Sequence, residues 1–99
     1  MRRRVPTRLV MAADYLADPL WTREPNGRTG AMVPLEQLPL SQATRARLRA
    51  WAARFDRLMD TGYEWPNAAE HRTWLADGRA LHRIVCVELG AGYEVSFQP

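Results

Sequence analysis

The strongest pattern in the chain is a pair of helical stripes of hydrophobic residues between Ser41 and Leu89. The first stripe recurs at steps of three and four residues, which is one side of a helix with about 3.6 residues per turn. Its members are Leu48, Trp51, Ala52, Phe55, Leu58 and Met59. The second stripe is spaced in much the same way and comprises Trp74, Leu75, Gly78, Leu81, Val85 and Leu89. Two such helices need a shared partner, most simply each other and a sheet.

Residues typical of helix ends border both stripes. Ser41 stands where an N-cap is expected, and Gly62 suits the left-handed position after a helix. Asn67 begins the second helix, with Glu70 three residues later as in a capping box. Gly78 lies at the centre of the second stripe, where glycine costs about 1 kcal/mol of helix propensity relative to alanine. We therefore expect the second helix to cross the first helix or the sheet closely at Gly78.

Short apolar runs before and after the helices predict the strands of a sheet. Residues 8–15 contain neither glycine nor proline and predict a central strand. Residues 20–23 and 31–33 flank a Pro-Asn-Gly turn and predict a hairpin. Its second strand is expected at a sheet edge, because Pro34 cannot donate a hydrogen bond to a neighbouring strand. The strict alternation over residues 93–97 predicts a last strand with Tyr93, Val95 and Phe97 directed inward.

These elements predict an α+β fold. We expect a two-layer sandwich in which the two main helices pack on one face of a small, largely antiparallel sheet. The connector over residues 34–40 is expected to place its leucines over one end of the core. A chain of 99 residues is long enough for one hydrophobic core. We expect a single α+β domain over residues 8–99, preceded by a basic, disordered arm over residues 1–7.

The charge of the chain is concentrated at its start. Fourteen basic and eleven acidic residues give a formal net charge of +3. Four of the basic residues are Arg2, Arg3, Arg4 and Arg8. All fourteen are arginine, so the arginine content by itself is a weak sign of phosphate binding. The single cysteine, Cys86, excludes an internal disulfide, and no apolar run reaches the roughly 20 residues of a membrane helix. We expect a cytoplasmic protein that does not bind a membrane.

Candidate catalytic and metal-binding groups are sparse. Asp56 and Asp60 are four residues apart and could share a proton or a divalent ion. His82 and Cys86 have the spacing of two metal ligands on one helix, but His71 lies about 16 Å further along the axis. No catalytic triad spacing and no glycine-rich phosphate loop occurs. We therefore predict no catalytic residues, no metal site and no cofactor.

Two tryptophans stand outside the helical stripes. Trp21 and Trp65 lie in connectors flanked by proline and acidic residues, where tryptophan serves as a lid over the core or as an interface anchor. We predict a binding surface built from Trp21, Asp56, Asp60, Tyr63, Glu64 and Trp65. An acidic and aromatic surface of this kind suits a basic protein partner, such as a toxin or the cationic cleft of a nuclease.

A set of short motifs resembles a family of small, uncharacterised bacterial proteins. The motifs are PLW at residues 19–21, LPLS at 38–41, Trp51, and ELG at 88–90 ahead of YEV at 93–95. The resemblance extends over residues 8–97 and implies a compact domain with no established activity and no catalytic residues. In size and style the chain is similar to immunity proteins, which neutralise a toxin by binding it.

The function predicted from these observations is a small, non-enzymatic protein-binding module, of the immunity type. Two alternatives stay open. The first is a nucleic-acid-binding accessory protein, whose affinity would fall steeply with salt. It would use the helix arginines together with Arg2, Arg3, Arg4 and Arg8. The second is a small-molecule or metal-assisted enzyme, which needs a concave pocket around perturbed groups. It would use Asp56, Asp60, His71 or His82.

Overall fold

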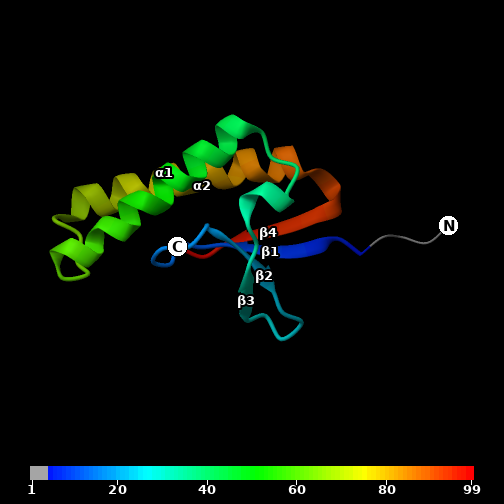
Figure 1. Ribbon diagram of the computed structural model, residues 1–99, viewed down its shortest axis with the longest axis horizontal. Helices are drawn as coiled ribbons and strands as arrows, with labels where there is room; N and C mark the ends of the chain where they lie inside the picture. The colour runs from blue at the N-terminus through cyan, green and yellow to red at the C-terminus, as the bar shows by residue number, and fades with distance from the viewer. Residues whose placement is uncertain (1–4) are drawn as a thin grey trace.

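The computed structural model of the protein describes residues 5–99 and consists of two long helices on one face of a four-stranded sheet (Figure 1). This is the predicted two-layer α+β fold. Three short 3₁₀ helices join the larger elements. In chain order the elements are β1 (Thr7–Met11), β2 (Leu20–Arg23), β3 (Thr29–Met32), η1 (Leu35–Gln37), α1 (Gln42–Asp56), η2 (Arg57–Thr61), α2 (Ala68–Leu89), η3 (Gly90–Gly92) and β4 (Tyr93–Phe97).

The sheet has the order β3-β2-β1-β4. The pairs β1–β2 and β2–β3 are antiparallel, whereas β1 and β4 run parallel, so the sheet is mixed and largely antiparallel. The parallel pair is possible because the long connection through both helices returns the chain to the same end of the sheet. In the register of β1, Leu9 lies beside Thr22 on one side and Val95 on the other. The predictions of a central β1 and of an edge position for β3 are confirmed.

The first strand is shorter than predicted. It ends at Met11, although the apolar run continues to Tyr15. After Met11 the Ala12 amide donates to the Pro19 carbonyl oxygen at 3.0 Å, and the chain leaves the sheet. Tyr15 then stacks on Phe55 of α1, with ring centroids 4.7 Å apart. Tyr15 therefore covers a helix instead of extending the strand, and an apolar run by itself does not distinguish the two.

Both predicted helix starts are confirmed. The Ser41 side chain accepts a hydrogen bond from the Thr44 amide at 3.1 Å, and the Asn67 side chain accepts one from the Glu70 amide at 2.8 Å. These bonds satisfy amides that have no partner inside the first turn of a helix. The first helix passes into η2 before the chain turns at Gly62, whose φ is +70°. The predicted turn at Gly62 is thus confirmed, with a 3₁₀ segment as the last part of the helix.

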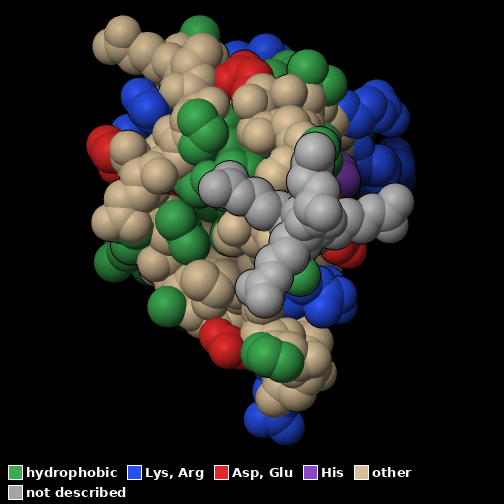
Figure 2. Space-filling model, turned by 90° about the vertical axis from the view of Figure 1, so that its right-hand side faces the viewer, with side chains coloured by type: hydrophobic (Ala, Val, Ile, Leu, Met, Phe, Trp, Pro, Cys, Tyr) green, Lys and Arg blue, Asp and Glu red, His purple; other side chains and the backbone are tan. Residues whose placement is uncertain are grey.

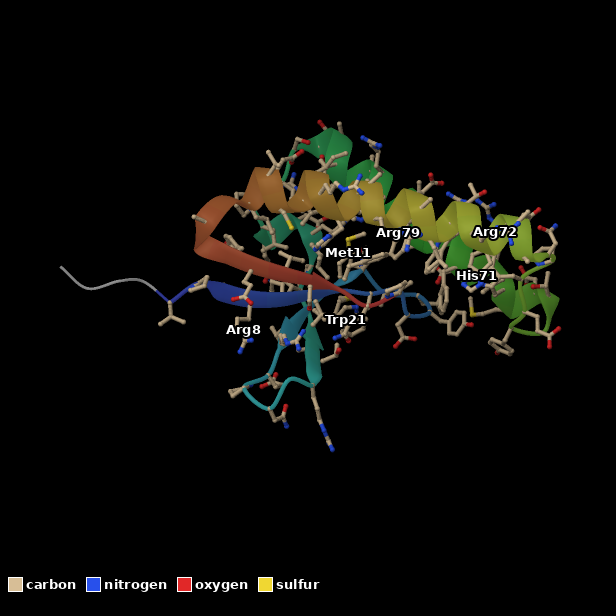
Figure 3. The ribbon with its side chains drawn as sticks, turned by 180° about the vertical axis from the view of Figure 1, so that it is seen from behind. Arg8, Met11, Trp21, His71, Arg72 and Arg79 are labelled. Atoms are coloured by element: carbon tan, nitrogen blue, oxygen red, sulfur yellow. The ribbon has the colours of Figure 1, made fainter. Side chains whose placement is uncertain are left out.

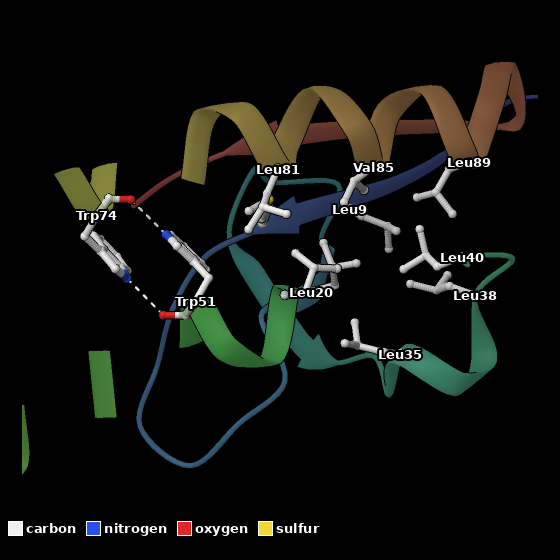
Figure 4. Packing of buried hydrophobic residues seen from close by; sticks show 12 residues of the cluster. Leu9, Leu20, Leu35, Leu38, Leu40, Trp51, Trp74, Leu81, Val85 and Leu89 are labelled. Carbon is white, nitrogen blue, oxygen red and sulfur yellow. Dashed lines mark hydrogen bonds between the residues drawn. The ribbon is translucent and has the colours of Figure 1, made fainter. Parts of the chain in front are cut away.

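The hydrophobic core lies between the helices and the sheet, and the connector leucines close one end of it (Figure 4). Burial of each such side chain contributes about 1.5 to 3 kcal/mol to folding. The buried cluster comprises Leu9, Met11, Leu20, Leu35, Leu38, Leu40, Leu48, Trp51, Trp74, Leu81, Val85 and Leu89. Tyr93, Val95 and Phe97 pack against it, as the alternation of the last strand predicts.

The two helices are joined by a reciprocal tryptophan pair (Figure 4). The rings of Trp51 and Trp74 stack with their centroids 4.4 Å apart, and each indole N–H donates to the other residue's carbonyl oxygen, at 2.9 and 3.0 Å. Both buried donors are therefore satisfied. Close by, a Cβ on Gly78 would lie 2.7 Å from ring atoms of both Phe97 and Trp51. The predicted close crossing at Gly78 is confirmed, and it involves the first helix and the sheet together.

The helix pair projects past the end of the sheet (Figures 1 and 3). The projecting end is η2 with the connector to α2, residues 57–67, and is called the helix tip below. The molecule measures 53 × 29 × 21 Å as a result. Contacts of Tyr15 with Phe55 and Tyr63 place the loop between β1 and β2 against this end of the helix pair. The β1–β2 loop and the end of the first helix thus meet at a place that the sheet does not cover.

Candidate protein-binding surface

The loop between β1 and β2 is fixed to the projecting end of the helix pair by three contacts. Tyr15 stacks on Phe55 and meets Tyr63 edge-on, with centroids 5.4 Å apart. The Leu16 amide donates to Asp56 Oδ1 at 3.0 Å. The residues at these contacts and beside them in the loop, the hairpin and the helix tip are together called the loop–helix surface. It comprises Asp14, Tyr15, Leu16, Asp18, Met32, Asp56, Asp60, Tyr63 and Glu64.

Two residues of the loop–helix surface have a strained backbone. Within residues 5–99, Leu16 (φ +58°) and Tyr63 (φ +63°) are the non-glycine residues with positive φ. The left-handed conformation costs such residues about 1 to 2 kcal/mol. Leu16 is held in it by the bond to Asp56, and the Tyr63 amide donates to the Leu58 carbonyl oxygen at 2.7 Å. The fold therefore fixes the positions from which these two side chains project.

Exposed hydrophobic side chains gather on the same surface. Leu16 is 80% exposed, Tyr63 64% and Met32 40%. The other large exposed hydrophobic side chains among residues 5–99 are Val5 and Val87, which belong to the start of the described chain and to α2. A group of exposed apolar residues is typical of an interaction site, whereas single ones are ordinary.

A shallow hollow of about 320 Å³ lies between Leu16 and Met32. Ala17 and Ala52 add apolar surface to it, and the Asp56 side chain lies at its edge. The other lining residues are Asp18 and Arg49. The hollow thus combines four apolar side chains with two carboxylates and one guanidinium group.

The carboxylates of this region fall into two groups. Asp18 and Glu36 both bind the Arg49 guanidinium, with Asp18 at 3.3 Å. These hydrogen bonds raise the pKa of Arg49, the one from Asp18 most, while a backbone hydrogen bond and then Arg49 lower the pKa of Glu36. In contrast, four carboxylates form no ion pair within residues 5–99. They are Asp14, Asp56, Asp60 and Glu64, so the loop–helix surface carries an excess of negative charge.

The structure brings together four of the six residues predicted to bind a partner. Asp56, Asp60, Tyr63 and Glu64 lie at the end of α1 and in the helix tip that follows. Trp65 follows directly, but it packs on Trp74 and on His71, with centroid distances of 5.2 Å in both cases. Its half-buried ring therefore closes the end of the core between the helices.

Trp21 lies elsewhere. It pairs with Val10 in the sheet, on the face opposite Leu9 and the helices, and its Nε1 donates to the Ala12 carbonyl oxygen at 3.0 Å. Figure 3 shows Trp21 at the sheet and His71, on which Trp65 stacks, at the projecting end of the helices. The two connector tryptophans therefore do not share one surface.

The arginines of the nucleic-acid hypothesis are divided between the two layers. Arg8 lies on the outer face of the sheet, since it alternates with the inward Leu9, whereas Arg72 and Arg79 lie on the helix layer (Figure 3). Figure 2 shows basic and acidic side chains around the rim of the molecule at the end where the chain begins, with the largest basic group on one side. Arg2, Arg3 and Arg4 lie outside the described residues.

The residues of the enzyme hypothesis are also dispersed. His71 stacks on Trp65, whereas His82 Nε2 contacts the Val95 carbonyl oxygen at 2.7 Å and the Cys86 sulfur at 3.5 Å. Burial raises the pKa of the Cys86 thiol, which lowers its thiolate fraction. Within residues 5–99, no three His, Cys, Asp or Glu side chains are grouped so that they could hold a metal ion. In the same range, no helix is long and apolar enough to cross a membrane.

Sequence reasoning missed the three large apolar side chains that the β1–β2 loop and the hairpin add to the loop–helix surface: Tyr15, Leu16 and Met32. Tyr15 was assigned to the first strand, and Met32 to the hairpin. A usable signal was present, because Asp14 and Asp18 bracket Leu16 just before Pro19. An apolar residue in such a polar, proline-bounded loop has few ways to be buried and is a candidate for an exposed contact.

These features define a small two-layer α+β protein with an apolar and acidic surface at the uncovered end of its helices. Residues 7–99 match the model of the Serratia CdiI immunity protein-like family, and the chain belongs to that family. The match includes every strand and helix described above. The sequence resemblance to a family of small bacterial proteins is consistent with this membership. None of the curated proteins compared with the chain matches it.

Proposed function

We propose that this protein is an immunity protein that neutralises a toxin by binding it, and that the loop–helix surface makes the contact. Membership of the Serratia CdiI immunity protein-like family supports the toxin as the kind of partner. The observation that carries the choice of surface is the gathering of exposed Leu16, Met32 and Tyr63 beside carboxylates that have no basic partner within residues 5–99.

The composition of the surface indicates the chemistry of the toxin face that it binds. Exposed apolar side chains in fixed positions supply affinity when they are desolvated, and a tyrosine such as Tyr63 is a frequent interface anchor. The carboxylates of Asp56, Asp60 and Glu64 attract a basic surface and accelerate the encounter with it. The matching toxin face therefore has an apolar centre surrounded by lysine or arginine side chains.

The two connector tryptophans have a supporting role in this proposal. Trp65 fixes the helix tip through its contacts with Trp74 and His71, so that Tyr63 and Glu64 are presented from a rigid base. Trp21 holds the start of the β1–β2 loop through its bond to Ala12. Neutralisation in this scheme needs no chemical step, because a bound toxin face that contains or borders the active site is blocked by occupancy.

A growth experiment tests the proposal. Toxin domains from the genome that encodes this chain are expressed one at a time in a sensitive bacterium, together with either the wild-type chain or an empty vector. We expect viable counts to recover only with the wild-type chain, and the two proteins to copurify as one complex. Unchanged killing, together with the absence of a complex between the purified proteins, would refute the proposed function.

A matched pair of variants then tests the surface. Leu16 and Val87 are almost equally exposed, at 80% and 81%, but lie on the loop–helix surface and on α2. We expect Leu16→Ala to weaken the complex and Val87→Ala to leave it unchanged, because only Leu16 belongs to the proposed contact. Protection that is equal in the two variants contradicts the surface while leaving the immunity function in place.

A further inference from the structure

The hollow between Leu16 and Met32 has the form of a receptor for one side chain of the partner. We infer that it receives a lysine or arginine side chain of the toxin, with the Asp56 carboxylate as counter-ion. This inference rests on the proposed function and names one charged contact within the loop–helix surface. It assigns to Asp56 a direct role in binding and to the hollow a single class of occupant.

The lining of the hollow suits the stem of a basic side chain. Lysine and arginine carry three or four methylene groups before the charge, and these groups cover apolar surface readily. Leu16 and Met32 line the hollow together with the small side chains of Ala17 and Ala52. A volume of about 320 Å³ accommodates such a stem, whereas an aspartate or glutamate would bring little apolar surface.

The charges around the hollow select a cation. Asp18 and Glu36 share the Arg49 guanidinium, so these three side chains together carry a charge of −1. Asp56 adds a further −1, because it forms no ion pair within residues 5–99. A guanidinium or ammonium group of the toxin would thus meet a negative site, and a carboxylate would be repelled.

The Asp56 carboxylate has room for a further donor. Its Oδ1 atom accepts the Leu16 amide at 3.0 Å. An ionised carboxylate accepts about four hydrogen bonds over its two oxygens, so the bond to Leu16 leaves capacity for a donor from the partner. The same bond fixes Leu16 beside the charge. The apolar and the charged part of the site are therefore positioned by one side chain, which reduces the entropy lost on binding.

An isosteric substitution separates the charge from the positioning role. Asp56→Asn keeps an Oδ1 acceptor for the Leu16 amide and removes the negative charge. Asp60→Asn is the comparison variant: it removes the same charge from the loop–helix surface, and so its share of the long-range attraction for the toxin, but Asp60 does not line the hollow. Binding to the toxin domain identified in the growth experiment is measured by titration calorimetry. We expect the Kd to rise at least about tenfold for Asp56→Asn and by no more than about twofold for Asp60→Asn.

The toxin side of the contact is identified by a double-mutant cycle. Each lysine and arginine of the toxin domain is replaced by methionine in turn, and each toxin variant is titrated with the wild-type chain and with Asp56→Asn. We expect one toxin position at which Asp56→Asn has no further effect, because the pair is already broken. A second variant of the chain, Met32→Arg, places a cation beside the hollow and is expected to weaken binding in the same way.

Each outcome decides the inference. It is overturned if the wild-type chain and Asp56→Asn bind equally well, if Asp56→Asn and Asp60→Asn weaken binding equally, or if no toxin position couples to Asp56. In these three cases the complex still forms and the proposed function stands. Failure of the wild-type chain to bind the toxin domain overturns the proposed function and the inference together. Should Asp56→Asn not fold, Met32→Arg binding with wild-type affinity overturns the inference.

Discussion

The two ends of the helix pair differ in how completely their polar groups are hydrogen-bonded and their apolar side chains are buried. At the end that lies over the sheet, the Ser41 amide donates to Glu88 Oε1 at 2.7 Å, and the Thr44 hydroxyl donates to the same carboxylate. The connector leucines and Leu89 are buried there. The last turn of α2 is thus bonded to the first turn of α1, and this end contributes to stability.

The projecting end has the opposite character. Leu16 and Tyr63 are exposed and have positive φ, and the carboxylates of Asp56 and Asp60 form no ion pair within residues 5–99. The tryptophan pair of Trp51 and Trp74 lies between the two ends and separates them. One half of this small fold has its polar groups hydrogen-bonded and its leucines buried. It supports a second half whose exposed side chains and carboxylates are fixed in position but not used in ion pairs within residues 5–99. Such a division is typical of a binding protein.

The largest effect is expected from breaking the tryptophan pair that separates the two ends. Trp51→Ala removes a buried ring and leaves the Trp74 carbonyl oxygen without the Trp51 indole N–H that donates to it, so we expect a loss of about 3 to 5 kcal/mol in the free energy of unfolding. Urea denaturation monitored by circular dichroism measures it. A loss below about 1 kcal/mol would show that the pair does not join the helices.

A smaller loss is expected at the helix crossing. The Cβ of any substitution at Gly78 would lie 2.7 Å from Trp51 and Phe97 ring atoms, so we expect Gly78→Leu to destabilise the fold by roughly 2 to 3 kcal/mol through overpacking. Thermal melting measures the effect. Gly92→Ala is the control, because a Cβ at Gly92 meets no atom within 4 Å. An unchanged Tm for Gly78→Leu contradicts the close crossing.

At the projecting end, a substitution is expected to raise the stability of the fold instead of lowering it. Leu16→Gly removes the exposed side chain and the cost of its positive φ, so we expect the free energy of unfolding to rise by about 0.5 to 1 kcal/mol while toxin binding weakens. Parallel melting and titration experiments measure the two quantities. A variant that loses stability and keeps its affinity would reverse the assigned roles of the two ends.

The stability that the end over the sheet contributes should decrease at low pH. Hydrogen bonds from the Ser41 amide and then from Thr44 lower the pKa of Glu88. Because the pKa of Glu88 is lowered in the folded state, its ionised carboxylate stabilises the fold at pH values above the ordinary glutamate pKa of 4.5. This stabilisation is lost as the pH falls through the pKa of the folded state. We expect the Tm of Glu88→Gln to lie below that of the wild type near pH 7, and the difference to shrink as the pH falls below 4.5 and Glu88 becomes protonated. A constant difference in Tm over this range contradicts this role.

Most of the helical layer was predictable from local patterns. The stripes containing Trp51 and Trp74, the N-caps Ser41 and Asn67, and the close contact at Gly78 follow from periodicity and residue type, and the structure confirms them. These features depend on residues a few positions apart in the chain. The same is true of the hairpin and of the edge position of its second strand.

The composition of the proposed binding surface was predictable only in part. Asp56 and Tyr63 were candidates because an acidic and aromatic cluster is visible in the sequence around the end of the first helix. Leu16 and Met32 were not, since their proximity to Asp56 depends on where the β1–β2 loop and the hairpin lie in space. Trp21 shows the converse, because its place on the outer face of the sheet separates it from the helix tip.

The sequence by itself determined the class of fold and the limits of its helices, because hydrophobic periodicity and capping residues act over one or two turns of the chain. Only the tertiary structure decided that β4 returns parallel to β1 and that the helices project beyond the sheet. It also decided that Leu16 binds Asp56 across 40 positions of the chain. Such contacts result from the packing of whole elements against one another, and no local pattern encodes them.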